Sequence, residues 1–215
     1  MVKLDIMSDP ICPWCYIGKA NLDRALAQRP DHPFLITWHP FQLNPDMPKQ
    51  GMDRRDYLET KFGGQDGAVK AYAPVVEHAE KAGLTLNLDA IKTTPNTINA
   101  HRLIHWAGIE ERQNDVVDAL FQAYFVDGRD IGDTDTLADI ADACGLDASV
   151  ILRLFSTDED VKDIVERDAA ARGMGVTSVP TFIVASQHAV PGSQPTELWL
   201  NVMDDLAAQG ATQDA

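Results

Sequence analysis

Two cysteines separated by two residues, Cys12 and Cys15, carry the clearest chemistry in the sequence. They end a short apolar run typical of a strand and open a segment with a helical pattern. Thiols at this spacing can close a small disulfide ring, and the free N–H groups and positive dipole of a helix N-terminus favour a thiolate. The pattern predicts redox chemistry, with an exposed Cys12 as nucleophile and a shielded Cys15 as resolving thiol. Asp5 and Asp9 are both candidates for altering thiol ionisation.

Two other interpretations of the cysteine pair are a zinc half-site and two core residues. A structural zinc site has four ligands, and the only further cysteine, Cys144, ends a helical run of small residues before Gly145. It resembles a small core residue. His101 and His105 are four residues apart, but no HExxH motif, third ligand or acidic cluster accompanies them, so we assign them to a solvated or cleft-lining helix face. We expect no metal.

The composition limits the possible classes of function. The chain has 215 residues, 45% of them hydrophobic, and a formal net charge of −15. Its length and apolar content suffice for one or two domains with a sizeable core. The negative charge argues against nucleic acid and against anionic membrane surfaces as partners. No leader pattern and no apolar run of membrane-spanning length occur, which predicts a cytoplasmic protein, and paired cysteines in that compartment are usually catalytic or metal-bound.

The elements that must position the cysteines form an α/β pattern that is interrupted by helices. Strand patterns cover residues 2–6, 34–41, 179–185 and 189–190, and helical patterns cover residues 12–27, 53–62, 66–82, 94–107, 115–127, 135–144, 147–155 and 158–172 and a last helix from 193. We predict an α/β fold in which residues 1–50 and 174–210 form one domain. Residues 51–173 then form an inserted α-helical domain, and residues 211–215 a flexible tail.

Several longer stretches of the sequence resemble a known family. They are residues 8–18 with the Cys-Pro-Trp-Cys motif, 38–45, 96–103, 123–125, 173–182 and 192–194. Over residues 1–210 the chain resembles the DsbA family of the thioredoxin superfamily, and within it the FrnE-like group of cytoplasmic dithiol-disulfide oxidoreductases. The resemblance implies a thioredoxin fold with a large α-helical insertion. It also implies a disulfide- or dithiol-containing protein or small molecule as the partner.

The resemblance places Val179 and Pro180, which are distant in the sequence, against the cysteine pair. It implies a cis peptide bond before Pro180 that exposes the backbone groups of Val179 to an extended substrate. From the residues alone, an ordinary proline at the start of an edge strand is the alternative. Pro13 fixes the turn at the first helical position without losing a hydrogen bond, and the broad ring of Trp14 offers apolar contact to a substrate.

Ser193 raises a second possible function. In the related kappa-class glutathione transferases and 2-hydroxychromene-2-carboxylate isomerases, a serine before the last helix recognises the γ-glutamyl end of glutathione. Ser193 corresponds to it, but Gln194 stands where these relatives carry aspartate, and they place serine at the position of Cys12. As an alternative, Ser193 is simply an N-cap.

The sequence therefore predicts a thiol-disulfide oxidoreductase with no tightly bound cofactor and with glutathione as a candidate co-substrate. A glutathione-dependent isomerase or transferase is the first alternative. A non-catalytic binding module or chaperone is the second. Either a monomer or a homodimer fits the sequence.

Overall fold

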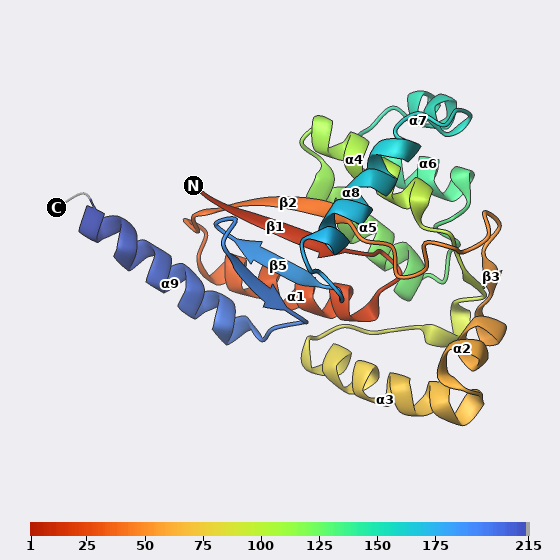
Figure 1. Ribbon diagram of the computed structural model, residues 1–215, viewed down its shortest axis with the longest axis horizontal. Helices are drawn as coiled ribbons and strands as arrows, with labels where there is room; N and C mark the ends of the chain where they lie inside the picture. The colour runs from red at the N-terminus through yellow and green to blue at the C-terminus, as the bar shows by residue number, and fades with distance from the viewer. Residues whose placement is uncertain (214–215) are drawn as a thin grey trace.

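A four-stranded mixed sheet lies at the centre of the computed structural model, which describes residues 1–213, with side chains through residue 208. Its strands are β1 (Val2–Ser8), β2 (Phe34–Pro40), β5 (Thr181–Val184) and β6 (His188–Pro191). Their order is β2-β1-β5-β6, with β1 parallel to β2 and antiparallel to β5, and with β5 antiparallel to β6 (Figure 1). The chain thus leaves the central strand β1 directly into the cysteine motif.

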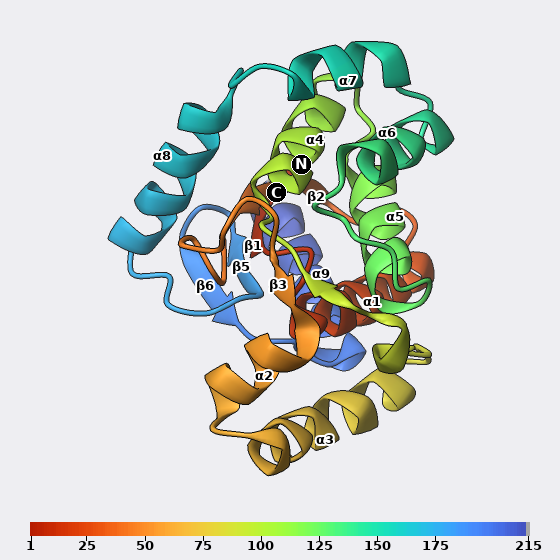
Figure 2. The same ribbon diagram turned by 90° about the vertical axis from the view of Figure 1, so that its right-hand side faces the viewer.

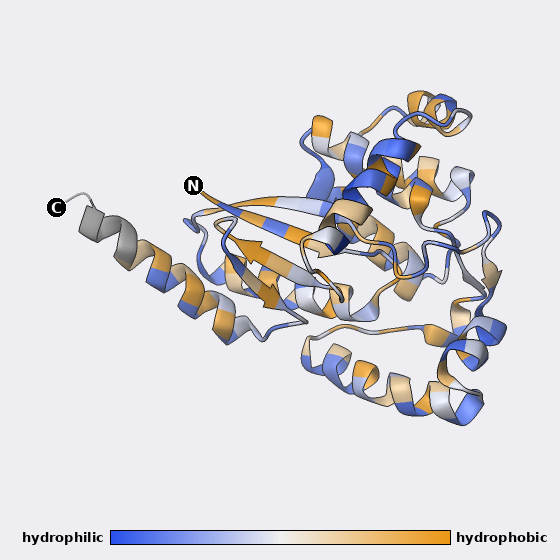
Figure 3. Cartoon of the chain, viewed as in Figure 1, coloured by the Kyte–Doolittle hydropathy of each residue, from blue (hydrophilic) through white to orange (hydrophobic). Residues whose placement is uncertain are grey.

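Helices cover both faces of this sheet. α1 (Pro13–Gln28) and α9 (Thr196–Gln213) pack against each other on one face, and α8 (Val161–Gly173) crosses the other face beside β2 (Figures 1 and 2). The strand β5 is largely hydrophobic, whereas α8 is mostly hydrophilic (Figure 3). This difference agrees with a helix that buries one narrow stripe and leaves the rest in water.

The helices between β2 and β5 form two groups. The first is the pair α2 (Arg54–Phe62) and α3 (Gln65–Lys81), and the second comprises α4 (Ile98–Ile109), α5 (Gln113–Phe125), α6 (Thr134–Ala143), α7 (Ala148–Phe155) and α8. The groups lie at opposite ends of the molecule (Figure 2). Between them run a short 3-10 helix, η1 (Leu88–Ala90), and a two-stranded antiparallel sheet of β3 (Met52–Asp53) and β4 (Thr93–Thr94). The architecture confirms the predicted α/β fold with a large helical insertion.

Most of the inserted helices share one core with the sheet. Ile6 of β1, Leu103 of α4, Phe121 of α5 and Trp199 of α9 are fully buried members of the same hydrophobic cluster. A second, small cluster joins α1 to α3 through Ile17, Val75, Ala79 and Ala82. The sheet and α4–α6 therefore form one packed body, and the α2–α3 pair rests on it through a smaller contact.

Several element boundaries differ from the sequence prediction. The helix expected from residue 94 begins at Ile98, because Thr93 and Thr94 pair with β3. The last helix begins at Thr196 and not at Ser193. Residues 211–213, expected in a flexible tail, belong to α9, and the rest of that tail, residues 214–215, lies outside the described residues.

Candidate active site

Cys12 ends the turn after β1 and is the N-cap residue of α1, with Pro13 in the first helical turn. The Cys12 N–H donates to the carbonyl of Asp9 at 2.9 Å, and the Cys12 carbonyl accepts from the N–H of Cys15 at 3.1 Å. This winding brings Cys12 and Cys15 to 3.5 Å from each other, both as free cysteines. Small movements of the two side chains would therefore close a disulfide.

Both thiols are buried. Cys12 is 3% exposed and Cys15 is 1% exposed, so the prediction of an exposed Cys12 is wrong, while the shielding of Cys15 is confirmed. The Cys12 thiol faces the carbonyl of Val179 and lines a cavity of about 280 Å³ together with Phe62 and Tyr72. This cavity is the space next to Cys12 in which a substrate could bind.

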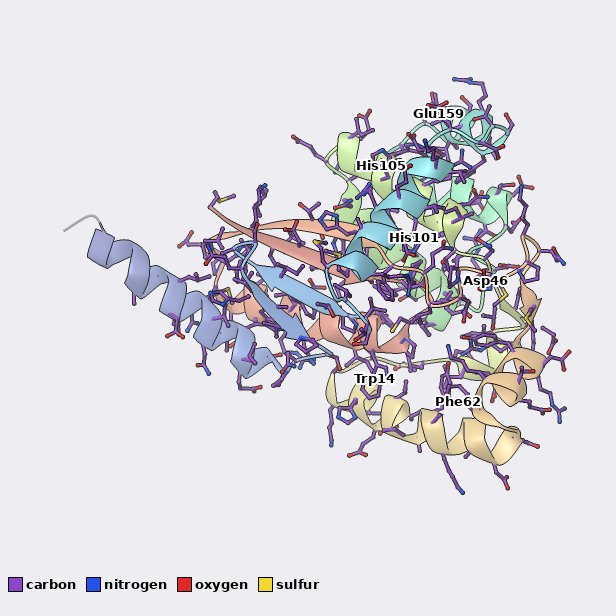
Figure 4. The ribbon with its side chains drawn as sticks, viewed as in Figure 1. Trp14, Asp46, Phe62, His101, His105 and Glu159 are labelled. Carbon is purple, nitrogen blue, oxygen red and sulfur yellow. The ribbon has the colours of Figure 1, made fainter. Side chains whose placement is uncertain are left out.

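The cavity lies between the N-terminus of α1 and the α2–α3 pair. Trp14 stands on the α1 side and Phe62 on the α2 side (Figure 4). Four of the residues assigned to the site from the sequence line it: Cys12, Pro13, Trp14 and Val179. The fold thus gathers residues from both ends of the chain around one space.

The segment before β5 lies against Cys12 although it is far away in the sequence. The Val179–Pro180 peptide bond is cis, and the Cys12 thiol donates to the Val179 carbonyl at 3.5 Å. A Cβ atom on Gly18 would lie 3.1 Å from Pro180 Cγ and 3.3 Å from the Cα of Ser193. Glycine thus lets α1 approach this segment closely. Ser193 and Pro180 approach the same point of α1, and Ser193 is not among the described residues that line the cavity.

The environment of Cys15 holds its proton in place. Burial raises the pKa of the Cys15 thiol well above its ordinary value, and its hydrogen bond with Cys12 raises this pKa further. The Ser8 hydroxyl and the Asp9 backbone favour the Cys15 thiolate, but they do not outweigh burial. Cys15 is therefore protonated at neutral pH, as suits a thiol that waits to resolve a mixed disulfide.

Of the two acids considered from the sequence, Asp9 is the one beside the cysteine turn. Its buried carboxyl group accepts the N–H of Leu43 at 2.7 Å and the N–H of Ile11 at 3.4 Å. Burial nevertheless raises the pKa of Asp9 to about 7. Asp5 instead pairs with His39 at 2.8 Å. The sequence alone could not tell these two acids apart.

His101 faces the carboxyl group of Asp9 from α4. Its Nε2 lies 3.8 Å from Asp9 Oδ1 and has no hydrogen-bond partner. Burial lowers the pKa of His101 to about 3, so the ring is neutral at pH 7 and does not form an ion pair with Asp9. Of the predicted solvated or cleft-lining face, the solvated part is wrong for His101, because α4 buries this side against the sheet. The cleft-lining part agrees with its place in the lining of a small pocket beside Trp38. His105 is partly exposed and accepts from Arg167 at 3.1 Å.

The α2 side of the cavity carries two cations that the sequence analysis missed. Arg54 donates to the hydroxyl of Tyr124 at 3.1 Å and to that of Tyr72 at 2.8 Å. Lys61 donates to the hydroxyl of Tyr57 at 2.6 Å. Arg54, Tyr57 and Lys61 all line the cavity, since their spacing places them on one helix face. That spacing is visible in the sequence, but nothing there positions this face opposite Cys12.

Within residues 1–213, no group of three or more His, Cys, Asp or Glu side chains is placed to hold a metal ion. In the same part of the chain, no helix combines the length and apolar character needed to cross a membrane.

A mixed sheet with a Cys-Pro-Trp-Cys turn at the start of its first helix, facing a proline segment before β5, defines a thioredoxin-like protein. A model of the DSBA-like thioredoxin domain matches residues 3–204, and the chain belongs to this family. Membership supports a thiol-disulfide oxidoreductase activity.

Individual relatives agree with this assignment. The chain is 27% identical over 207 residues to the uncharacterized protein YwbO of Bacillus subtilis (strain 168), covering 95% of this chain and 96% of that protein. A crystal structure of the probable DsbA oxidoreductase SCO1869 from Streptomyces coelicolor matches with a TM-score of 0.84 and 26% identity, covering 95% of this chain and 89% of that one. The structure of a 2-hydroxychromene-2-carboxylate isomerase shares the fold, with a TM-score of 0.74 and 18% identity over 99% of this chain and 100% of the other.

Proposed function

We propose that this protein is a dithiol-disulfide oxidoreductase in which Cys12 is the nucleophile and Cys15 the resolving thiol. The observation that carries the proposal is the position of the pair: two free cysteines, 3.5 Å apart, at the N-terminus of α1 and beside a cavity. The helix N-terminus favours negative charge on Cys12. The burial of Cys15 keeps its thiol protonated until Cys12 has reacted.

The reaction proceeds in two exchanges. The Cys12 thiolate attacks one sulfur of a substrate disulfide, forms a mixed disulfide and releases the other sulfur as a thiolate. Cys15 then loses its proton, attacks the Cys12 sulfur and releases the second substrate thiolate. Two electrons pass from the dithiol to the substrate, and the protein is left with a disulfide between Cys12 and Cys15. The reverse sequence oxidises a dithiol.

The surroundings of Cys12 support roles for three further residues. The carbonyl of Val179 lies within reach of the sulfur, so its backbone can pair with a substrate bound there, and Pro180 holds this segment in place. Trp14 supplies an apolar wall. We propose that the reaction needs no tightly bound cofactor, and that it takes place in the cytoplasm, where paired cysteines are usually catalytic or metal-bound.

Trapping the mixed disulfide tests this proposal. A Cys15→Ser variant, incubated with cell extract and analysed by mass spectrometry, should accumulate protein or small-molecule adducts on Cys12, because nothing resolves them. Cys12→Ser should form no adduct in the cavity. Cys144→Ser is the matched control, because it removes a partly exposed cysteine at the end of α6, outside the proposed site. The Cys144→Ser variant should turn over disulfide substrate at the same rate as the unchanged protein.

The same variants separate the alternatives. Equal residual turnover in Cys12→Ser and Cys15→Ser would contradict the redox proposal and favour a binding module. Saturable glutathione binding with isomerase activity that survives Cys15→Ser would favour the glutathione-dependent alternative. That alternative draws on the shared fold with the isomerase, whereas the position of Ser193 outside the cavity lining gives it no support from the site.

A further inference from the structure

Arg54 is a buried cation without an acidic partner. It is 7% exposed, and no ion pair among the described residues includes it. Its side-chain hydrogen bonds go to two neutral hydroxyls, those of Tyr72 and Tyr124. The guanidinium also lies 5.5 Å from the centre of the Tyr72 ring and 5.8 Å from that of Tyr124. Buried charges are normally paired, so a cation placed in this way is open to an anionic ligand.

The position of Arg54 connects it with the reactive sulfur. Arg54, Tyr72 and Cys12 line the same cavity. Tyr72 is close enough to Cys12 for the charge of that sulfur to influence the Tyr72 hydroxyl, whose pKa is raised mainly by burial. An anion bound at Arg54 would therefore lie within the same small space as the sulfur that reacts.

The charge of the cavity differs from that of the whole molecule. Arg54 and Lys61 are the charged residues of the lining, and none of the described lining residues is an acid. The protein as a whole carries a net charge of −15. A cavity with two cations in so acidic a molecule is a local site for anions.

We propose that this cavity selects low-molecular-weight disulfides and thiols that carry a carboxylate, which Arg54 binds while Cys12 attacks the sulfur. The volume of about 280 Å³ suits a compact ligand. Lys61, at the same wall, adds a second positive charge. This inference deepens the proposed function and rests on it. The electron balance is unchanged: the dithiol of Cys12 and Cys15 is oxidised, and the disulfide is reduced to two carboxylate thiols.

Two isosteric disulfides test the inference directly. Dithiodipropionate carries two carboxylates, and its diamide carries none. The fully reduced protein should react with the dianion at least about ten times faster than with the diamide, because a charge-assisted pair is formed only with the former. In Arg54→Gln this ratio should fall at least about tenfold, and in Arg54→Lys it should fall less.

Arg55→Gln is the matched control for charge. Arg55 follows Arg54 in the chain, but it is exposed and paired with Glu59 at 2.8 Å, so its removal should leave the ratio within about twofold. Each ratio is measured within one protein, so a loss of stability in a variant does not imitate the effect. A ratio near one in the unchanged protein, or a ratio that Arg54→Gln leaves unaltered, overturns the inference.

A binding measurement separates this inference from the redox proposal. Thiodipropionate has a thioether in place of the disulfide and cannot react. It should quench or shift the fluorescence of the unchanged protein, since Trp14 lines the cavity, and Arg54→Gln should weaken its binding at least about tenfold. If thiodipropionate binds in an Arg54-dependent way but Cys12 forms no mixed disulfide with any substrate, the redox proposal is wrong and the anion site is kept. If the protein reduces disulfides but does not bind thiodipropionate, only the anion site is wrong.

Discussion

The two groups of inserted helices support the cysteine turn in different ways. α4 and α5 share the main core with the sheet, and Leu103 and Phe121 are buried in it completely. α2 and α3 contribute little to this core. The buried residue of α2 is Arg54, and α3 buries Val75 and Ala79 in the small cluster against α1.

This difference in packing separates the cysteine pair from the wall of the cavity that faces it. The cysteine pair stands on the strand and helix that the main core holds, whereas the wall opposite Cys12 belongs to the less firmly packed α2–α3 pair. Substitutions on that wall should therefore cost little stability, and under the inference drawn above they would change which ligands the cavity selects. The inserted region thus consists of two differently packed parts.

Truncation of one core residue in each group should show the largest difference. Phe121→Ala should lower the free energy of unfolding by about 3 to 5 kcal/mol, because it opens a cavity in the main core. Val75→Ala removes two carbon atoms from the small cluster and should cost about 1.5 kcal/mol. Denaturant unfolding with both variants measures the two losses. Equal losses would mean that α3 belongs to the main core.

Hydrogen exchange should reveal the same division without any mutation. Amides in the middle of α5 should exchange only through global unfolding, and those of α2 and α3 through local opening. We expect α5 amides to exchange at least about a hundredfold more slowly than α3 amides, a difference of about 2.7 kcal/mol. Mass spectrometry of peptides from the two helices measures it. Matching rates at several denaturant concentrations would show a single cooperative unit.

The sequence predicted the cysteine turn better than the α2–α3 wall of the cavity. Cys12, Pro13 and Cys15 form a local motif, and the resemblance supplied the contact with Val179. Arg54 lies in no such motif. Its place in the cavity depends on how α2 packs, and α2 follows directly on β3, whose partner β4 is distant in the sequence. The expected exposure of Cys12 was wrong because the thiol packs against the Val179 segment, a long-range contact that the helix pattern around Cys12 does not reveal.

Buried polar residues were equally hard to predict. His101 lies outside the apolar stripe of its helix, so hydrophobic periodicity does not decide whether it is buried. Only the packing of α4 reveals its contact with Asp9. The roles of Asp5 and Asp9 depend in the same way on which neighbours the fold provides. The element types were predictable from periodicity, while the partners of individual side chains were not.

The burial of Asp9 and of His101 predicts two opposing pH dependences. The pKa of Asp9 rises from 3.8 to about 7 on folding, so between these values the folded protein holds a proton that the unfolded chain lacks, and stability falls as pH rises. The pKa of His101 falls from 6.5 to about 3 on folding, so here the unfolded chain holds the extra proton and stability rises with pH. The two slopes largely cancel in the unchanged protein.

Single substitutions should expose each slope. Between about pH 4 and 6.5, Asp9→Asn should make the slope of stability against pH more positive by about 1 kcal/mol per unit, and His101→Gln should make it more negative by a similar amount. Denaturant titrations across this range measure both, and other acids affect the two variants alike. If both variants shift the slope in the same direction, then Asp9 is not buried as a protonated carboxyl group or His101 is not buried as a neutral ring.

The smallest effect should come from the contact between the cysteine turn and α3. The ring of Trp14 meets that of His78 edge-on, with the centroids 5.2 Å apart, and an aromatic contact of this kind contributes about 0.5 to 1.5 kcal/mol. His78→Ala should therefore raise the exchange rate of α3 amides by about threefold to tenfold, because local opening becomes easier. The amides of α5 should not respond, since their exchange requires the main core to unfold. His188→Ala, at an exposed histidine of β6, is the matched control and should change neither helix. A parallel rise in α5 would show that the contact stabilises the whole molecule, and the two-part description of the inserted helices would then be wrong.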